Sequence, residues 1–152
     1  MLVQTTPLMG VLFQDARNTA VLLSENKTGK SLSSSDVILS INAKNPIPRV
    51  EGPSAGALIT LITISEIYSN IKLNNSITLT GTIDSKGNIG AIGGVLEKAK
   101  AAKAGGKTPF LIPKENSELV IYKYIERNKY VERNFGGLTF VERAPEVLNA
   151  KE

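Results

Sequence analysis

A serine between small residues is the part of the chain whose spacing suggests chemistry. The run Gly52-Pro53-Ser54-Ala55-Gly56 has the spacing G-x-S-x-G and directly precedes a long apolar segment. This spacing suits a serine held on a tight turn at the start of a helix, with its hydroxyl exposed for attack on a substrate. A proline-led helix start without chemistry has the same appearance. Ser54 is therefore a candidate nucleophile, with a purely structural turn as the alternative.

The residue types that the chain lacks restrict which base could activate Ser54. There is no histidine, so a Ser-His-Asp triad is excluded. There is no cysteine either, which removes disulfides, thiol catalysis and the commonest zinc sites. We therefore expect neither a metal nor a cofactor. The usual substitute for histidine is a lysine with a lowered pKa.

The lysine most suited to this task lies in a helix predicted over residues 95–104. The buried face of that helix is predicted from Val95, Ala99 and Ala102. At about 100° per residue, Lys98 and Lys103 both flank this face, whereas Lys100 points away from it. Lys98 differs in lying in the first turn, where the positive end of the helix dipole disfavours an ammonium ion.

The energy that a lysine base requires shows what the structure must supply. A free lysine has a pKa near 10.4, and lowering it by about 3 to act near neutrality amounts to roughly 4 kcal/mol. A helix terminus supplies about 0.3–1 kcal/mol, whereas burial can lower a lysine pKa by about 3–5. Burial must therefore contribute most. A surface lysine that lays its aliphatic stem along the helix remains the alternative for Lys98.

The rest of the sequence predicts one mixed α/β domain that would hold these residues. At 152 residues, with 41% hydrophobic and 21% charged residues, the chain has the composition of a soluble globular domain. Strands are predicted at residues 8–13, 36–41, 76–82, 89–92, 108–112 and 138–141. Helices are predicted at residues 15–26 (with Asp15 as N-cap), 53–69, 95–104 and 117–128 and at the C-terminus. The order predicts a mixed sheet with flanking helices, in which residues 84–88 form a hairpin turn.

Neither a nucleotide site nor a membrane segment is predicted. Gly29-Lys30-Ser31 has the ending of a phosphate-binding loop, but Ser24 stands where that loop needs its first glycine. No run reaches the roughly 18 apolar residues of a membrane span, and no signal peptide is evident. The net charge of +4 comes from scattered residues. A solvated helix face explains the lysines between residues 98 and 107 as well as an acidic partner would.

Four motifs in order give the chain a family resemblance. They are Gly-Pro-Ser-Ala-Gly at 52–56, Leu-Thr-Gly at 79–81, Gly-Gly-Val-Leu-Glu-Lys at 93–98, and Ile112-Pro113 with Asn116. Over roughly residues 36–116 the sequence resembles the proteolytic domain of the Lon proteases. The resemblance implies a catalytic dyad of Ser54 and Lys98. It also implies that Thr80 lies beside the lysine and that Glu51 is the acidic residue three before the serine.

The match also has departures. Glu51 looks like archaeal members of the family, whereas Pro53 looks like the bacterial spelling. The segment before residue 36 matches loosely and is similar to archaeal Lon-like serine proteases that carry no ATPase. We therefore expect residues 1–152 to be one Lon-like proteolytic domain, either excised or ATP-independent by itself. An ATPase domain or a membrane anchor would belong to a longer parent protein, either cytoplasmic or membrane-tethered, so the localisation stays open.

The resemblance implies hydrolysis of peptide bonds. Neutral Lys98 would take the proton of Ser54, and the resulting ammonium would donate it to the leaving amine. Backbone N–H groups in the turn formed by Gly52, Pro53 and Ala55 would hold the oxyanion. Thr80 would hold the lysine amine in line. Close to Lys98, Glu51 would raise the lysine pKa, so its role is either structural or that of blocking an inactive site.

The expected partners are unfolded polypeptides as substrates and, by resemblance, further copies of the chain in a hexamer. The alternative is a non-catalytic basic binding module with a Lon-like fold. Its basic residues are not interleaved with aromatic ones, and only 5% of residues are aromatic. Because stacking on aromatic side chains is a main source of affinity for single strands, we expect no nucleic-acid binding.

Overall fold

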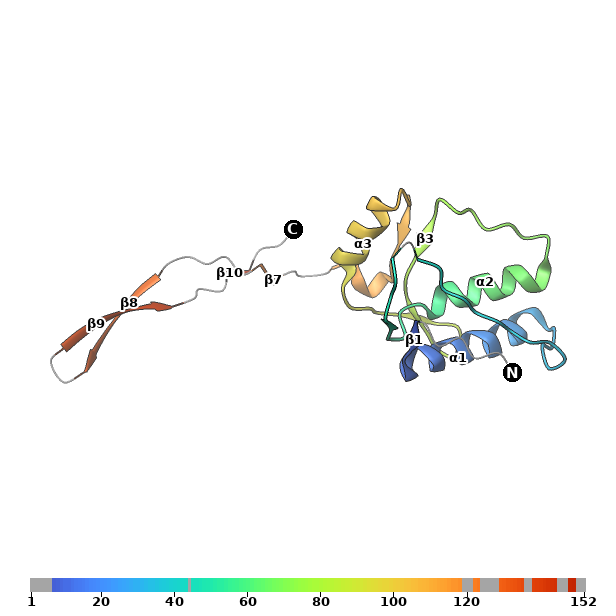
Figure 1. Cartoon of the computed structure of the whole chain (residues 1–152), viewed down its shortest axis with the longest axis horizontal. Helices are drawn as coiled ribbons and strands as arrows, with labels where there is room; N and C mark the ends of the chain where they lie inside the picture. The colour runs from blue at the N-terminus through green and yellow to red at the C-terminus, as the bar shows by residue number, and fades with distance from the viewer. Residues whose placement is uncertain are drawn as a thin grey trace. The chain divides into compact units, whose positions relative to one another are not determined.

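The computed structural model describes residues 7–43 and 45–118, together with four strands between residues 122 and 149 (Figure 1). The chain forms two compact units, Met1–Ser117 and Glu118–Glu152, and each is described by itself. All residues predicted for catalysis lie in the first unit.

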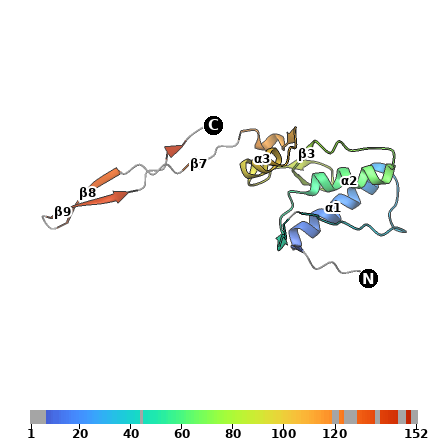
Figure 2. The same ribbon diagram turned by 45° about the horizontal axis from the view of Figure 1, so that its top comes forward.

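Two helices packed side by side form the core of the first unit (Figures 1 and 2). They are α1, Val11–Thr28, and α2, Gly56–Tyr68. Phe13, Ala20 and Ile59 form the buried cluster between them. The fully buried Ser24 hydroxyl donates to Ala20 O at 2.7 Å and to Thr60 O at 3.3 Å across the helix pair. Small residues at this contact allow the helices to approach closely. The helix predicted over residues 53–69 is confirmed as α2.

The start of α1 differs from the prediction. The expected strand over residues 8–13 is only Leu8–Met9 (β1), which pairs in parallel with Arg49–Val50 (β2). The helix begins at Val11, after Gly10, so Asp15 lies in its second turn and does not cap it. Phe13 explains the difference, because a helical residue here shares its buried face with Ala16 and Ala20.

Short strands and a third helix complete the first unit. Thr78–Leu79 (β3) pairs in parallel with Phe110–Leu111 (β6), and Thr82–Ile83 (β4) pairs with Ile89–Gly90 (β5) as the predicted antiparallel hairpin. The third helix, α3, spans Val95–Ala104, the predicted bounds. The 3-10 turn η1, Lys114–Asn116, follows β6.

The strand predicted over residues 36–41 is wrong. This segment has no regular structure, and Ile38 is 79% exposed. Leu39 and Ile41 pack against the core cluster, which explains the apolar alternation. A strand also needs a neighbouring backbone to complete its ladder, and none of the described strands supplies one here.

The second unit consists of two antiparallel strand pairs. Lys129–Phe135 (β8) pairs with Leu138–Ala144 (β9), which confirms the strand predicted at 138–141. Tyr122–Lys123 (β7) pairs with Leu148–Asn149 (β10). The predicted helix over 117–128 is therefore wrong at β7, and the predicted C-terminal helix is wrong at β10. The other residues of both helices from 119 onward lie outside the described residues.

Helices combined with parallel and antiparallel pairs confirm the predicted mixed α/β class. The described strands form two-stranded sheets, and most of these strands contain only two residues. No described helix is long and apolar enough to cross a membrane.

Candidate active site

Ser54, Thr80 and Lys98 line one cavity of about 330 Å³. Its wall is completed mainly by apolar side chains from α2, α3 and β6, among them Leu58, Ala101 and Phe110. Two larger cavities of about 400 and 430 Å³ border α2 elsewhere, and neither is lined by Ser54 or Lys98. The candidate nucleophile and candidate base thus share a cavity although 44 positions separate them in the sequence.

A turn places Ser54 immediately before α2. Gly52 has φ 85°, a left-handed conformation that favours glycine, and open space surrounds its α-carbon. The amide of Gly56 donates to Pro53 O at 3.1 Å and closes the turn around Ser54 and Ala55. Ser54 lies in this turn, two residues before the first residue of α2, and is half-buried. Its place at the start of a helix agrees with the motif.

Two donors hold the backbone of Ser54. The carbonyl oxygen of Ser54 accepts hydrogen bonds from the Thr80 hydroxyl at 3.0 Å and from the Gly81 amide at 2.9 Å. Thr80 is buried, and its own amide donates to Leu111 O at 3.0 Å, which ties it to β6. The observed contact of the Thr80 side chain is therefore with the serine. A contact between Thr80 and the Lys98 amine stays a prediction.

The amides of Ser54 and Ala55 have no protein acceptor in the described part of the chain. They lie at the N-terminal end of α2, where unpaired amides and the helix dipole favour negative charge. The turn that contains Gly52 and Pro53 therefore leaves two N–H donors at the start of α2, and their role as an oxyanion hole stays a prediction.

Lys98 lies in the first turn of α3 and is half-buried. Its amine donates to Gly93 O at 2.7 Å, and its amide donates to Gly94 O at 3.0 Å. Across the described part of the chain, no hydrogen bond joins the Lys98 amine to the Ser54 hydroxyl. Ser54 and Lys98 therefore line one cavity, while the Lys98 amine is hydrogen-bonded to Gly93 in the loop before α3.

The other lysines of this region are distributed differently from the prediction. Lys100 and Lys103 are exposed and do not line the cavity. Exposure of Lys100 agrees with the prediction that it points away from the buried face, whereas Lys103 was predicted to flank that face as Lys98 does. Lys107 does line it, and its amine contacts Asn75 O. Sequence reasoning missed Lys107 because it follows the Gly105-Gly106 turn, where helix periodicity no longer indicates direction.

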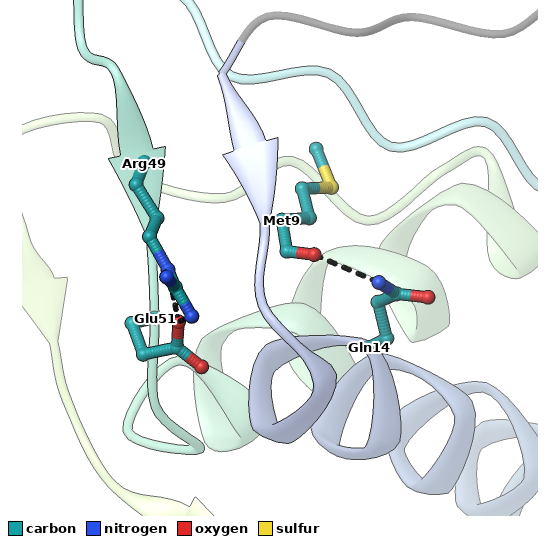
Figure 3. Close-up of polar contacts among 4 residues, drawn as sticks. All are labelled: Met9, Gln14, Arg49 and Glu51. Atoms are coloured by element: carbon teal, nitrogen blue, oxygen red, sulfur yellow. Dashed lines mark hydrogen bonds and ion pairs between the residues drawn. The ribbon is translucent and has the colours of Figure 1, made fainter.

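Glu51 faces α1. Its carboxylate forms an ion pair with Arg49 (Figure 3), and it does not line the cavity of Ser54. A Cβ atom built on Gly10 would lie 2.0–2.2 Å from this carboxyl group, so Glu51 fits closely against the residue that precedes α1. A separate hydrogen bond, from Gln14 of the first α1 turn to Met9 O at 2.7 Å, joins the helix to β1 (Figure 3). These contacts favour the structural alternative for Glu51.

Comparison with known proteins identifies the family of the chain. Residues 20–150 match the family described as Lon protease (S16) C-terminal proteolytic domain. The chain is 38% identical over 87 residues to Lon protease 2 of Bacillus subtilis (strain 168), which covers 57% of the chain and 15% of that relative. It is 40% identical over 98 residues to Lon protease of Fervidobacterium nodosum, or 64% of the chain and 11% of that relative. The Rickettsia felis Lon protease is 45% identical over 71 residues, 46% of the chain and 9% of the relative.

These matches cover a small part of the relatives' own length, so they concern the proteolytic domain and not the whole protein. The family match extends over 20–150 and includes all the motifs from Gly52 to Asn116. The resemblance expected from the sequence is thereby confirmed. The chain belongs to the family of Lon protease (S16) C-terminal proteolytic domains.

Proposed function

We propose that this chain is a serine endopeptidase that hydrolyses unfolded polypeptides through a Ser54–Lys98 dyad, without ATP, and that residues 1–152 act as one proteolytic domain. The observation that carries the proposal is the shared cavity of Ser54 and Lys98 in a member of the Lon proteolytic-domain family.

The proposed chemistry uses the lysine amine in its neutral form. The amine takes the Ser54 hydroxyl proton as the serine oxygen bonds to the substrate carbonyl carbon. The ammonium then donates this proton to the leaving amine, and water repeats the sequence on the acyl-enzyme. The N–H groups of Ser54 and Ala55 stabilise the negative charge on the carbonyl oxygen in both steps.

The dyad requires a movement of Lys98. No hydrogen bond joins its amine to the Ser54 hydroxyl among the described residues, so its side-chain torsions must change. A neutral amine has two N–H groups and one lone pair, so it can keep donating to Gly93 O while it accepts the Ser54 proton. This hydrogen bond is at the protein surface, where exchange with water makes its net contribution small, about 0.5–1.5 kcal/mol. Substrate that enters the cavity displaces water and so favours the contact between the Lys98 amine and the Ser54 hydroxyl.

Labelling with a serine-directed fluorophosphonate tests the nucleophile. We expect one labelled residue, Ser54, and loss of both labelling and casein cleavage in Ser54→Ala. Ser85→Ala, a change at an exposed turn serine, is the matched control and should label like wild type. Salt-sensitive binding to an acidic partner that survives Ser54→Ala, without labelling of the wild type, would instead identify the non-catalytic binding module.

Self-association belongs to the same proposal. Hexamers are expected from the family resemblance, and without an ATPase ring the association of this domain should be weak. Sedimentation at increasing concentration measures it, and a strict monomer would remove the hexamer while leaving the dyad unaffected.

A further inference from the structure

Asn116 makes two hydrogen bonds from a buried position to one residue of the loop before α3. Its side chain is 6% exposed, its Oδ1 accepts from the Ile92 amide at 2.9 Å, and its Nδ2 donates to Ile92 O at 3.0 Å. The preceding residue, Glu115, accepts from the Ala91 amide at 2.9 Å through Oε2. The η1 turn therefore holds residues 91 and 92 by three hydrogen bonds.

The loop held in this way supplies the contacts of Lys98. One and two residues after Ile92, the carbonyl groups of Gly93 and Gly94 accept from the amine and from the amide of Lys98. Gly94 has φ 66° and begins α3. A change in the backbone position of Ile92 therefore moves Gly93 and Gly94, and with them the acceptors of the side-chain amine and the backbone amide of Lys98.

The same segment is also attached to the serine half of the site. β6 pairs with β3, and Leu111 O accepts from the Thr80 amide at 3.0 Å. Thr80 in turn donates to Ser54 O. Residues 110–116 thus contact Thr80, which holds Ser54, through Leu111, and Ile92, which precedes the glycines that hold Lys98, through Asn116.

We propose that Asn116 is a positioning residue for Lys98: its two hydrogen bonds to Ile92 fix where the lysine stands relative to Ser54. This inference rests on the proposed dyad. Asn116 touches neither the substrate nor the reacting atoms and acts through the loop. Apolar replacement would leave both backbone groups of buried Ile92 without their partner, so the loop would shift to regain water.

The main experiment compares Asn116→Ala with Ser24→Ala. Both remove a buried polar side chain that bonds to backbone, but Ser24 lies between α1 and α2, away from the cavity. We expect kcat of Asn116→Ala to fall on the order of tenfold to a hundredfold, because small misplacements of reacting groups have such effects. KM should stay within about twofold, and Ser24→Ala should change neither constant beyond that.

Amide hydrogen exchange provides a readout that does not depend on activity. Asn116→Ala should raise the exchange rates of the Ile92 and Ala91 amides and leave the amides of α1 protected. Acylation of Lys98 by an amine-reactive reagent, measured relative to exposed Lys100, should also change in Asn116→Ala and stay constant in Ser24→Ala. If Ser54→Ala retained peptidase activity, the dyad would fail while these two measurements still reported on the positioning of Lys98.

Glu115→Ala keeps the proposal testable if Asn116→Ala does not fold. Glu115 is exposed, so its loss releases only the Ala91 amide, and we expect kcat to fall by about twofold to fivefold with unchanged stability. Unchanged kcat and unchanged Lys98 acylation in either folded variant, despite faster exchange at residues 91 and 92, would overturn the inference. An equal fall of kcat in Ser24→Ala would assign the effect to stability alone.

Discussion

The hydroxyl of Thr80 donates a hydrogen bond to the carbonyl oxygen of Ser54 at 3.0 Å, and the amide of Gly81 donates to the same oxygen at 2.9 Å. A threonine that was expected to hold the base therefore holds the backbone of the candidate nucleophile. This contact determines the orientation of the turn from which the Ser54 hydroxyl enters the cavity.

Thr80→Val removes the hydroxyl and keeps the shape of the side chain. We expect the free energy of unfolding to fall by about 1 kcal/mol, because Gly81 still satisfies the Ser54 carbonyl. We also expect kcat to fall on the order of tenfold, because the turn loses one of its two restraints. Urea unfolding and peptidase assays measure the two effects.

Thr63→Val is the matched control, since the Thr63 hydroxyl is also buried and donates to a backbone carbonyl, that of Ile59 at 2.8 Å. It lies within α2 and does not line the cavity. It should lower stability without lowering kcat. Equal kcat values for both valine variants would show that Thr80 contributes to folding only.

Lys98→Arg separates a base from a structural cation. Arginine keeps the positive charge and much of the aliphatic stem, but it stays protonated at every accessible pH. We expect Lys98→Arg and Lys98→Ala to be as inactive as Ser54→Ala, because the members of a catalytic unit lose activity non-additively. The wild-type rate should rise with pH, because only the neutral amine accepts a proton.

Lys100→Ala and Lys103→Ala should retain most activity, since both side chains are exposed outside the cavity. Substantial activity in folded Lys98→Arg would contradict the dyad. Lys107 would then be the next lysine to test, because it lines the same cavity.

Gly52→Ala tests how far the turn before Ser54 depends on a left-handed backbone. Gly52 has φ 85° with open space around it, so alanine adds conformational strain and no clash. We expect a loss of about 1–2 kcal/mol in the free energy of unfolding. Gly93→Ala, at an equally open position without a left-handed φ, should stay within about 0.5 kcal/mol of wild type. Equal losses would rule out backbone strain as the cause.

The lowered pKa of Asp84 predicts how its contribution to folding stability depends on pH. Hydrogen bonds from the Asn88 side chain and the Asn88 amide, followed by the Lys86 amide, hold the pKa of Asp84 below its usual 3.8. Because the folded-state pKa is lowered, its stabilising contribution is present above pH 3.8. It is lost as the pH falls through the lower folded-state value.

Asn88→Ala removes the largest cause of this shift and keeps the backbone amides. The pKa of Asp84, followed by carboxyl carbon NMR, should therefore rise part of the way toward 3.8. Ser85→Ala, in the same turn, should leave it unchanged. A pKa that stays equally low without Asn88 would assign the shift to the backbone amides.

Cleavage by this chain should not depend on nucleotide. The sequence contains no complete phosphate-binding loop, because Ser24 replaces the first glycine of the motif. Unstructured casein should be cut equally with and without ATP, and folded proteins should resist. Stimulation by ATP would reveal a nucleotide site within these residues.

Local signals explain which elements could be predicted from the sequence. Glycines at both ends delimit α3, and Asp84 with Gly87 and Asn88 specifies a tight turn, so both were predicted with correct positions. The segment over 36–41 has the same apolar alternation as a strand, but its side chains serve the helical core and its backbone finds no neighbour among the described strands. The sequence of a segment does not show whether another strand lies beside it to pair with.

In the candidate site, too, some features could be predicted from local motifs and others could not. The motifs predicted Ser54 and Lys98, and the structure places both at one cavity. The hydrogen bond from Thr80 to the serine backbone and the position of Lys107 depend on how separate segments meet in three dimensions. Residue spacing along the chain carries no information about either.

The carbonyl of Ser54 is held by residues 26 and 27 positions further along the chain. These contacts are absent until the loop between Ser54 and Thr80 has closed. Under the proposed mechanism, the serine is therefore an ineffective nucleophile in a nascent or partly folded chain. If the chain accepts unfolded polypeptides, as proposed, this dependence restrains it from cutting its own copies during synthesis, when unfolded polypeptides of its own kind are nearest.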